Sequence, residues 1–218
     1  MVSAEEIVAL QDRMTAAWHA IADARSAGSL AGPPSDARDG KKDAENWLGQ
    51  VARQHRANFD LWHIEDAARA PGATDTEVAQ VKRRVDKTNQ LRNDLAEELD
   101  RTLLDWVESC GLPNLAAPLH SESPGLIIDR LSILALKIYH TREEAERADA
   151  PPGHAERNRQ RLAILEEQRT DLADCLDALW RDTLSGARRF KLYRQLKMYN
   201  DPSLNPAIYG KVPSGQGR

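Results

Sequence analysis

Apolar residues recur at helical spacing along most of the chain, and this periodicity constrains the fold more than any other feature. β-branched and aromatic residues never alternate with polar ones over the length of a strand. Glycine and proline clusters separate the helical segments, which we predict at 5–27, 43–70, 74–109, 124–150, 155–185 and 187–199. The sequence therefore predicts an all-α fold, an antiparallel bundle of five or six helices with a buried polar and charged network.

The ends of the chain differ from its centre. Residues 28–42 include two prolines and three glycines, which is typical of a flexible connection, and prolines and glycines return after residue 201. We therefore divide the chain into an N-terminal helix with its flexible connection at 1–42, a helical core domain at 43–200 and a C-terminal tail at 201–218.

Charge and hydropathy exclude several classes of protein. The formal net charge of −4 gives no indication of nucleic-acid binding. No apolar run approaches the roughly 20 residues that span a bilayer, and the N-terminus is acidic where a signal peptide is basic. Two cysteines lie far apart without a C-x-x-C pair. We expect a cytoplasmic protein with no membrane partner.

The helix predicted at 74–109 carries polar residues where an apolar stripe is expected. Arg92 falls among the core-facing positions, and a buried guanidinium is costly unless paired, so we expect a carboxylate partner on another helix. Beside this stripe, a second line of short polar side chains forms either a hydrogen-bonding site or a solvated face. Its members are Lys82, Asp86, Asn89, Asn93 and Asp100.

The helix predicted at 124–150 is apolar around nearly its whole circumference, which indicates a buried helix. Asp129, Lys137, His140 and Glu144 nevertheless fall on one side of it. Buried charges are rarely left unpaired. Either they belong to a structural network with partners such as Arg92, or they line a cavity.

Two further segments bear on function. On the helix predicted at 43–70, one face carries Asn58, Trp62, Glu65 and Arg69; Trp62 is most simply a core residue, and Glu65 is either a catalytic carboxylate or the partner of Arg92. The basic segment around Arg194 either binds an anion or neutralises the acidic helix at 74–109.

Several blocks of residues, taken together, resemble a known family. They are Asn58-x-x-Leu61-Trp62-x-x-Glu65-Asp66-x-x-Arg69, Asp86-x-x-Asn89-Gln90-x-Arg92-Asn93-Asp94, Ser121-Glu122-Ser123-Pro124-Gly125-x-Ile127-Ile128-Asp129-Arg130-Leu131, Lys137-Ile138-Tyr139-His140 and Phe190-Lys191-x-Tyr193-Arg194. Over roughly residues 46–209 the chain resembles the bacterial family catalogued as domain of unknown function 4254. The resemblance implies no established activity; it suggests a role in bacterial glycan or secondary metabolism.

No phosphate-binding loop, nucleophile elbow or zinc-protease motif occurs, so no motif identifies a reaction. We consider two main hypotheses and, as a weaker third, RNA binding through the basic segment at 187–199. The first is an enzyme or binding protein for a small anionic molecule that bears a sugar, nucleotide or phosphate. Its candidate catalytic residues are Glu65, Asp129 and His140. Its candidate ligand-binding residues are Asn58, Asp86, Asn89, Arg92, Asn93, Lys137 and Arg194.

The second hypothesis is a non-catalytic helical module that binds a protein partner or a second copy of itself. It predicts an exposed apolar patch, with Trp18, Trp47, Trp106 and Trp180 as candidate anchors. We assign no metal ligands, and the sequence leaves the cofactor unknown.

Overall fold

A computed structural model describes residues 3–26, 47–196 and 203–206. Within these ranges the chain forms five helices: α1 (Ala4–Ser26), α2 (Trp47–Ala67), α3 (Asp75–Ser109), α4 (Pro124–Glu146) and α5 (His154–Leu184). The described ranges contain no strand, only one isolated bridge between Leu119 and Arg189. The all-α prediction is confirmed. None of the described helices has the length and apolarity needed to cross a membrane.

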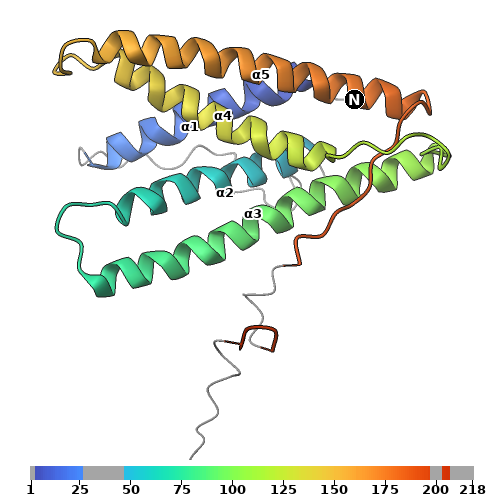
Figure 1. Ribbon diagram of the computed structural model, residues 1–218, viewed down its shortest axis with the longest axis horizontal. Helices are drawn as coiled ribbons and strands as arrows, with labels where there is room; N and C mark the ends of the chain where they lie inside the picture. Colours follow the sequence, from blue (N-terminus) through green and yellow to red (C-terminus); the bar gives the residue numbers. More distant parts are fainter. Residues whose placement is uncertain (1–2, 27–46, 197–202, 207–218) are drawn as a thin grey trace, which may run out of the picture.

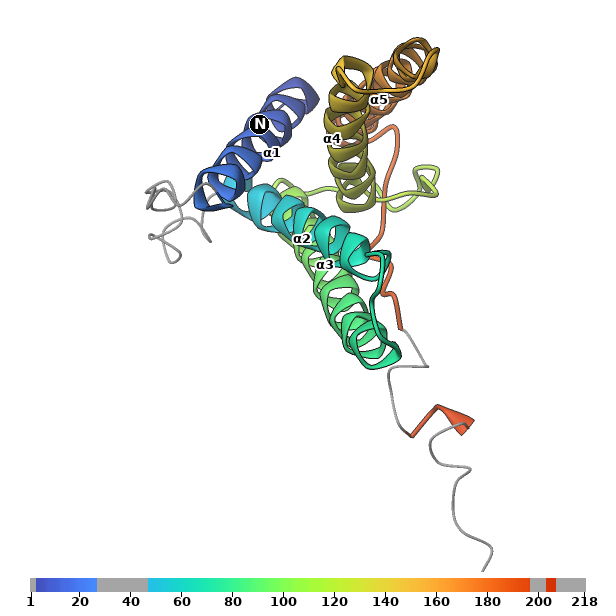
Figure 2. The same ribbon diagram turned by 90° about the vertical axis from the view of Figure 1, so that its left-hand side faces the viewer.

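Short connections fold four of the helices into two hairpins. The turns at 68–74 and 147–153 join α2 to α3 and α4 to α5, and short connections of this kind make neighbouring helices antiparallel. Figure 1 shows the helices lying roughly along one axis, and Figure 2 shows the two hairpins end-on with α1 beside them. The connection predicted at 28–42 lies outside the described residues, as does most of the predicted tail.

The helix starts follow from local chemistry. Thr74 accepts a hydrogen bond from the Glu77 backbone at 3.3 Å, and the Glu77 carboxylate accepts one from the Thr74 backbone N–H at 2.8 Å. This reciprocal capping box fixes the start of α3 as predicted. Pro124 occupies the first turn of α4, where its missing N–H costs nothing.

The hydrophobic core centres on α4 and includes α1. Ile127, Ile128 and Leu131 of α4 are at most 1% exposed. They belong to one cluster with residues from every other helix, including Ile7 of α1. The N-terminal helix therefore shares the core of the rest of the chain. The prediction of a helix buried almost all round is correct for α4 except on one side, where Lys137 is exposed.

The predicted helix after Gly186 is wrong for residues 187–196, and residues 197–199 lie outside the described ranges. The segment 187–196, here called the C-terminal strap, runs from α5 across α3 (Figure 1), where the Gln195 N–H donates to Glu97 Oε1 at 2.8 Å. Its backbone pairs with residues 118–120 through the Arg189 carbonyl and N–H, at 2.7 and 3.1 Å. Phe190 is 2% exposed. Burying this ring and pairing this backbone outweighs the weak helical preference of the segment.

Candidate functional site

The carboxylate of Asp129 is buried in α4 and surrounded by hydrogen-bond donors. Only 6% of the residue is exposed. Its Oδ1 accepts from Gln54 Nε2 at 2.5 Å, Asn58 Nδ2 at 2.9 Å and Arg92 Nε at 2.7 Å. Its Oδ2 accepts from Arg92 Nη2, which completes a two-point ion pair between α3 and α4. The predicted carboxylate partner of Arg92 is thus Asp129, and the predicted buried polar network exists.

The ion pair also fixes the charge of Arg92. The hydrogen bonds with Asp129 raise the pKa of the guanidinium, against the opposing effect of burial. Arg92 therefore keeps a full positive charge, with 23% of its side chain exposed.

A chain of hydrogen bonds runs from this ion pair to α1. Asn58 Nδ2 donates to Ser132 Oγ at 2.9 Å, and Ser132 Oγ lies 2.7 Å from His55 Nδ1. His55 Nε2 lies 2.9 Å from Thr15 Oγ1, whose hydroxyl donates to the Gln11 carbonyl at 2.9 Å. Because Thr15 already donates, it accepts from His55 Nε2–H, and Ser132 donates to Nδ1. The bonding pattern thereby assigns the tautomer of His55.

Burial supports this assignment. His55 is fully buried, and loss of solvation lowers its pKa to about 4. The imidazole is therefore neutral at ordinary pH, as a ring that both donates and accepts must be. Every link in the chain has one donor and one acceptor, so the direction of each hydrogen bond is determined.

An open pocket of about 450 Å³ lies beside the ion pair. It is formed between α2, α3 and α4, and it joins an apolar wall to a group of charged and amide side chains. Its lining residues are Asn58, Leu61, Trp62, Glu65, Asp66, Arg69, Arg92, Ile133 and Leu136. The volume falls within the range of sites for small molecules. Of the charges predicted to be buried on α4, Asp129 therefore belongs to a network, and none lines this cavity; its partner Arg92 does.

The structure brings together four of the ten candidate site residues. Asn58, Glu65 and Arg92 line the pocket, and Asp129 lies directly behind Arg92. Glu65 pairs with Arg69 at 3.2 Å rather than with Arg92.

The other six candidates lie outside the pocket lining. Asp86 pairs with Lys82 and borders a separate surface hollow. Asn89 and Asn93 are half-buried on α3, while Lys137 and Arg194 are exposed. His140 stacks on Trp62 with a centroid distance of 4.9 Å, and its Nδ1 is 2.9 Å from Glu143 Oε2.

Sequence reasoning missed several uncharged members of the network, Gln54 and Ser132 among them. Gln54 precedes Asn58 by one helical turn, and Ser132 follows Asp129 by three residues, so both pairs share a helix face. These spacings offered a signal, but a buried glutamine or serine is not distinctive until its partner is known.

A second buried carboxylate joins α3 to the start of α4. Asp100 is 2% exposed; its Oδ1 accepts from the Gly125 N–H at 2.6 Å, and its Oδ2 accepts from the Ser123 hydroxyl. Burial raises the pKa of Asp100 to about 6, although both hydrogen bonds oppose the rise. The side chain thus caps the first turn of α4, and the polar line predicted on α3 is buried at this position rather than solvated.

The pocket and the ion pair beside it fall within a recognised protein family. A family model described as "Protein of unknown function (DUF4254)" matches residues 49–192. The chain belongs to this family. The matched range includes every residue that lines the pocket, whereas α1 precedes it. No curated protein and no solved structure matches the chain.

Proposed function

We propose that the protein binds a small anionic molecule in the pocket between α2, α3 and α4, with Arg92 as the anion-binding residue. The observation that carries this proposal is the position of the Arg92 guanidinium, which is held by buried Asp129 and also lines the pocket. Carboxylate and phosphate groups match the planar fork of arginine.

The ion pair leaves part of the guanidinium available. Asp129 accepts from Nε and Nη2, and no hydrogen bond from Nη1 to the described part of the chain occurs. The N–H groups of Nη1 are thus free to meet a ligand. Because Gln54 and Asn58 also hold the carboxylate, the guanidinium is oriented before a ligand arrives, which lowers the entropic cost of binding. In this proposal Asp129 is a positioning residue.

The remaining lining residues suit the body of a sugar- or nucleotide-like molecule. Leu61, Ile133 and Leu136 supply an apolar wall. Asn58 uses both amide hydrogens on Asp129 and Ser132, so its Oδ1 can accept from a ligand hydroxyl or amine. Glu65, which is partly exposed, is the carboxylate that we retain for proton transfer if the bound molecule reacts.

A thermal-shift screen tests this proposal with nucleotides, sugar nucleotides, sugar phosphates and their uncharged sugar counterparts. A ligand at about 100 times its Kd stabilises the folded state by about 2.7 kcal/mol. For a chain of this size that corresponds to a rise in Tm of about 5–10 °C.

The decisive variant is Arg92→Lys, which keeps the charge beside Asp129 but loses the fork. Its Tm response to the anionic ligand should largely disappear, whereas Arg101→Lys, an exposed change on the same helix, should respond like the wild type. Equal responses in all three proteins, or responses to the uncharged sugars alone, would contradict the proposal.

A second candidate function is favoured by one observation. Trp106 of α3 is 43% exposed and lies 5.6 Å, between ring centroids, from the half-buried Trp180 of α5. Leu184, one turn after Trp180, is also exposed. Exposed aromatic residues next to apolar neighbours are typical anchors of protein interfaces. If this surface joins two copies of the chain, sedimentation velocity should show a dimer that Trp106→Ser converts to monomer; a monomeric wild type would exclude self-association.

A further inference from the structure

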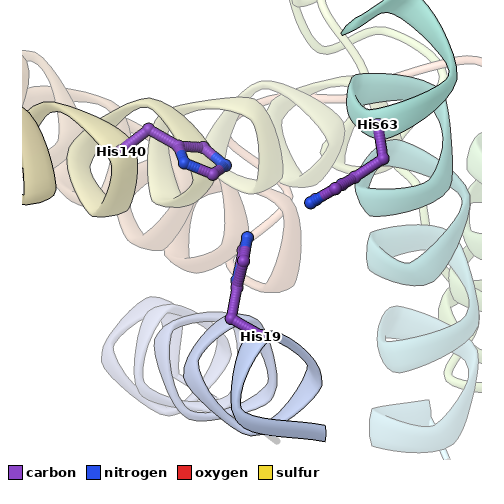
Figure 3. Close-up of side chains that lie close together, drawn as sticks. All are labelled: His19, His63 and His140. Atoms are coloured by element: carbon purple, nitrogen blue, oxygen red, sulfur yellow. The ribbon is translucent and has the colours of Figure 1, made fainter. Parts of the chain in front are cut away.

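Three histidines from three different helices converge at one place outside the pocket lining. His19 lies on α1, His63 on α2 and His140 on α4, and Figure 3 shows their rings pointing toward one common space. One potential ligand nitrogen from each ring lies within 4.8 Å of the other two. The three residues are widely separated in the sequence, so no short sequence motif identifies them as a group.

The outer nitrogen of each ring already has a partner. His19 Nδ1 is 2.8 Å from the Thr15 carbonyl, and His63 Nδ1 is 2.9 Å from the Phe59 carbonyl. A carbonyl only accepts, so both nitrogens carry a hydrogen, and Nε2 of each neutral ring has a free lone pair. His140 Nδ1 is 2.9 Å from Glu143 Oε2 and takes the same role toward a carboxylate. Metal-binding histidines are typically held in this way.

The inner nitrogens lack partners in the described part of the chain. Nε2 of His19 and Nε2 of His140 are both buried and make no hydrogen bond there. His55 provides the contrast, because both of its ring nitrogens are bonded. Burying a polar atom without a partner costs free energy, and two such atoms directed at one space point to a missing ligand.

Aromatic neighbours hold the rings in place. His19 stacks on Tyr139 with a centroid distance of 4.3 Å, His63 stacks on Phe59 at 4.3 Å, and His140 stacks on Trp62 at 4.9 Å. Burial, together with the charges that His140 and His63 can carry, lowers the pKa of His19. Neutral imidazole is the form that binds a metal.

We propose that His19, His63 and His140 bind one divalent first-row transition-metal ion, with Zn²⁺ as the reference ion, through their Nε2 atoms. Imidazole suits zinc, copper, nickel and iron, whereas calcium and magnesium require oxygen ligands. This proposal does not depend on ligand binding in the pocket, although Trp62 both lines the pocket and stacks on His140.

The geometry fits after a small adjustment. Tetrahedral zinc with Zn–N distances of about 2.0–2.1 Å places its ligand nitrogens about 3.3 Å apart. The rings must therefore approach by about 1.5 Å at most from the separations observed. His63 is exposed, so its side chain can make this movement and the ion can enter from that side. Three protein ligands leave a fourth position for water or another small ligand, as in catalytic zinc sites.

Metal binding by the full-length protein tests the proposal. Zn²⁺ affinity is measured by competition with a chromophoric chelator, and Co²⁺ coordination by its visible absorption. The wild type should bind one ion per chain, with a Co²⁺ spectrum typical of nitrogen and oxygen ligands in a tetrahedral arrangement.

Variants separate this site from adventitious binding. His63→Gln and His140→Gln should each weaken Zn²⁺ binding by about 100-fold or more. His63 is exposed, so its substitution should not disturb folding. Glu143→Gln should weaken Zn²⁺ binding by about 10–100-fold, the usual effect of losing the partner of a ligand histidine. The matched control is His154→Gln, a half-buried histidine that pairs with Glu144 and is not one of the three clustered histidines. Unchanged affinity in His63→Gln, equal losses in the control, or thiolate absorption bands in the Co²⁺ spectrum would overturn the assignment.

Discussion

Replacing Asp100 by asparagine should change how the stability of the protein depends on pH. The carboxyl group of Asp100 is buried where α3 meets the start of α4, and burial raises its pKa from an ordinary value of 3.8 to about 6. Asparagine has nearly the same shape. Its Oδ1 can accept from the Gly125 N–H and its Nδ2 can donate to the Ser123 hydroxyl, so both contacts survive without a titrating group.

The sign of the effect follows from proton binding. Between about pH 4 and pH 6 the folded state keeps a proton on Asp100 that the unfolded state has lost, so rising pH favours the unfolded state. Each pH unit of separation between the two pKa values is worth about 1.4 kcal/mol. The protonated Asp100 carboxyl makes its full contribution to the free energy of unfolding below about pH 4, and this contribution of about 3 kcal/mol is lost once the pH has risen through 6.

The assay is urea unfolding of the wild type and of Asp100→Asn at intervals from pH 4 to pH 8. The difference in free energy of unfolding should move by about 3 kcal/mol in favour of the variant across this range. His55 titrates in the same range but is present in both proteins, so it cancels in the difference. Asp105→Asn, an exposed change on the same helix, controls for the altered net charge. A difference that stays constant with pH would refute the argument that burial raises the pKa of Asp100.

Three further substitutions test other contacts. Gly125→Ala would place a Cβ 2.3 Å from the Ala96 carbonyl oxygen, so we expect a loss of about 1–3 kcal/mol in the free energy of unfolding, and an unchanged urea midpoint would contradict this. Arg92→Met leaves buried Asp129 without its cation and should lower the free energy of unfolding by about 3–5 kcal/mol. Adding Asp129→Asn should restore much of this loss. No recovery in the double variant would argue against the ion pair. As pH falls from 6.5 to about 4, the free energy of unfolding of the wild type should decrease by up to about 3 kcal/mol, because the buried neutral ring of His55 resists protonation. His55→Gln should not show this decrease. Parallel pH profiles of the two proteins would contradict the argument.

The helices could be predicted from the sequence because their signals are local. Apolar periodicity predicted the bounds of the five helices to within a few residues, and Thr74 followed by Glu77 indicated the start of α3. The partner of Arg92 was predictable in kind, because a guanidinium on a core-facing stripe requires a carboxylate. Asp129 was already a candidate, since it lies on the most apolar of the described helices.

The features that escaped prediction depend on contacts between distant segments. The C-terminal strap is extended because Arg189 pairs with residues 118–120 and Phe190 is buried, and neither contact is visible in local propensity. Lys137 was expected either in the network or in a cavity, but it lies on the side of α4 that is open to solvent. His19 and His63 carry no motif, because their convergence with His140 exists only after three helices have packed.

The hydrogen-bond chain from Asp129 to α1 has a mechanical consequence. Because every group along it has a single role, from Asn58 through Ser132 and His55 to Thr15, no other arrangement of the protons satisfies all of them at once. A displacement of α1 therefore cannot be absorbed by reversing one bond. A displacement of α1 that keeps every bond at its present length reaches the amide that holds Asp129, and from there the Arg92 guanidinium. A continuous line of hydrogen bonds thus connects the first helix to the Arg92 guanidinium, although none of the described side chains of α1 lines the pocket.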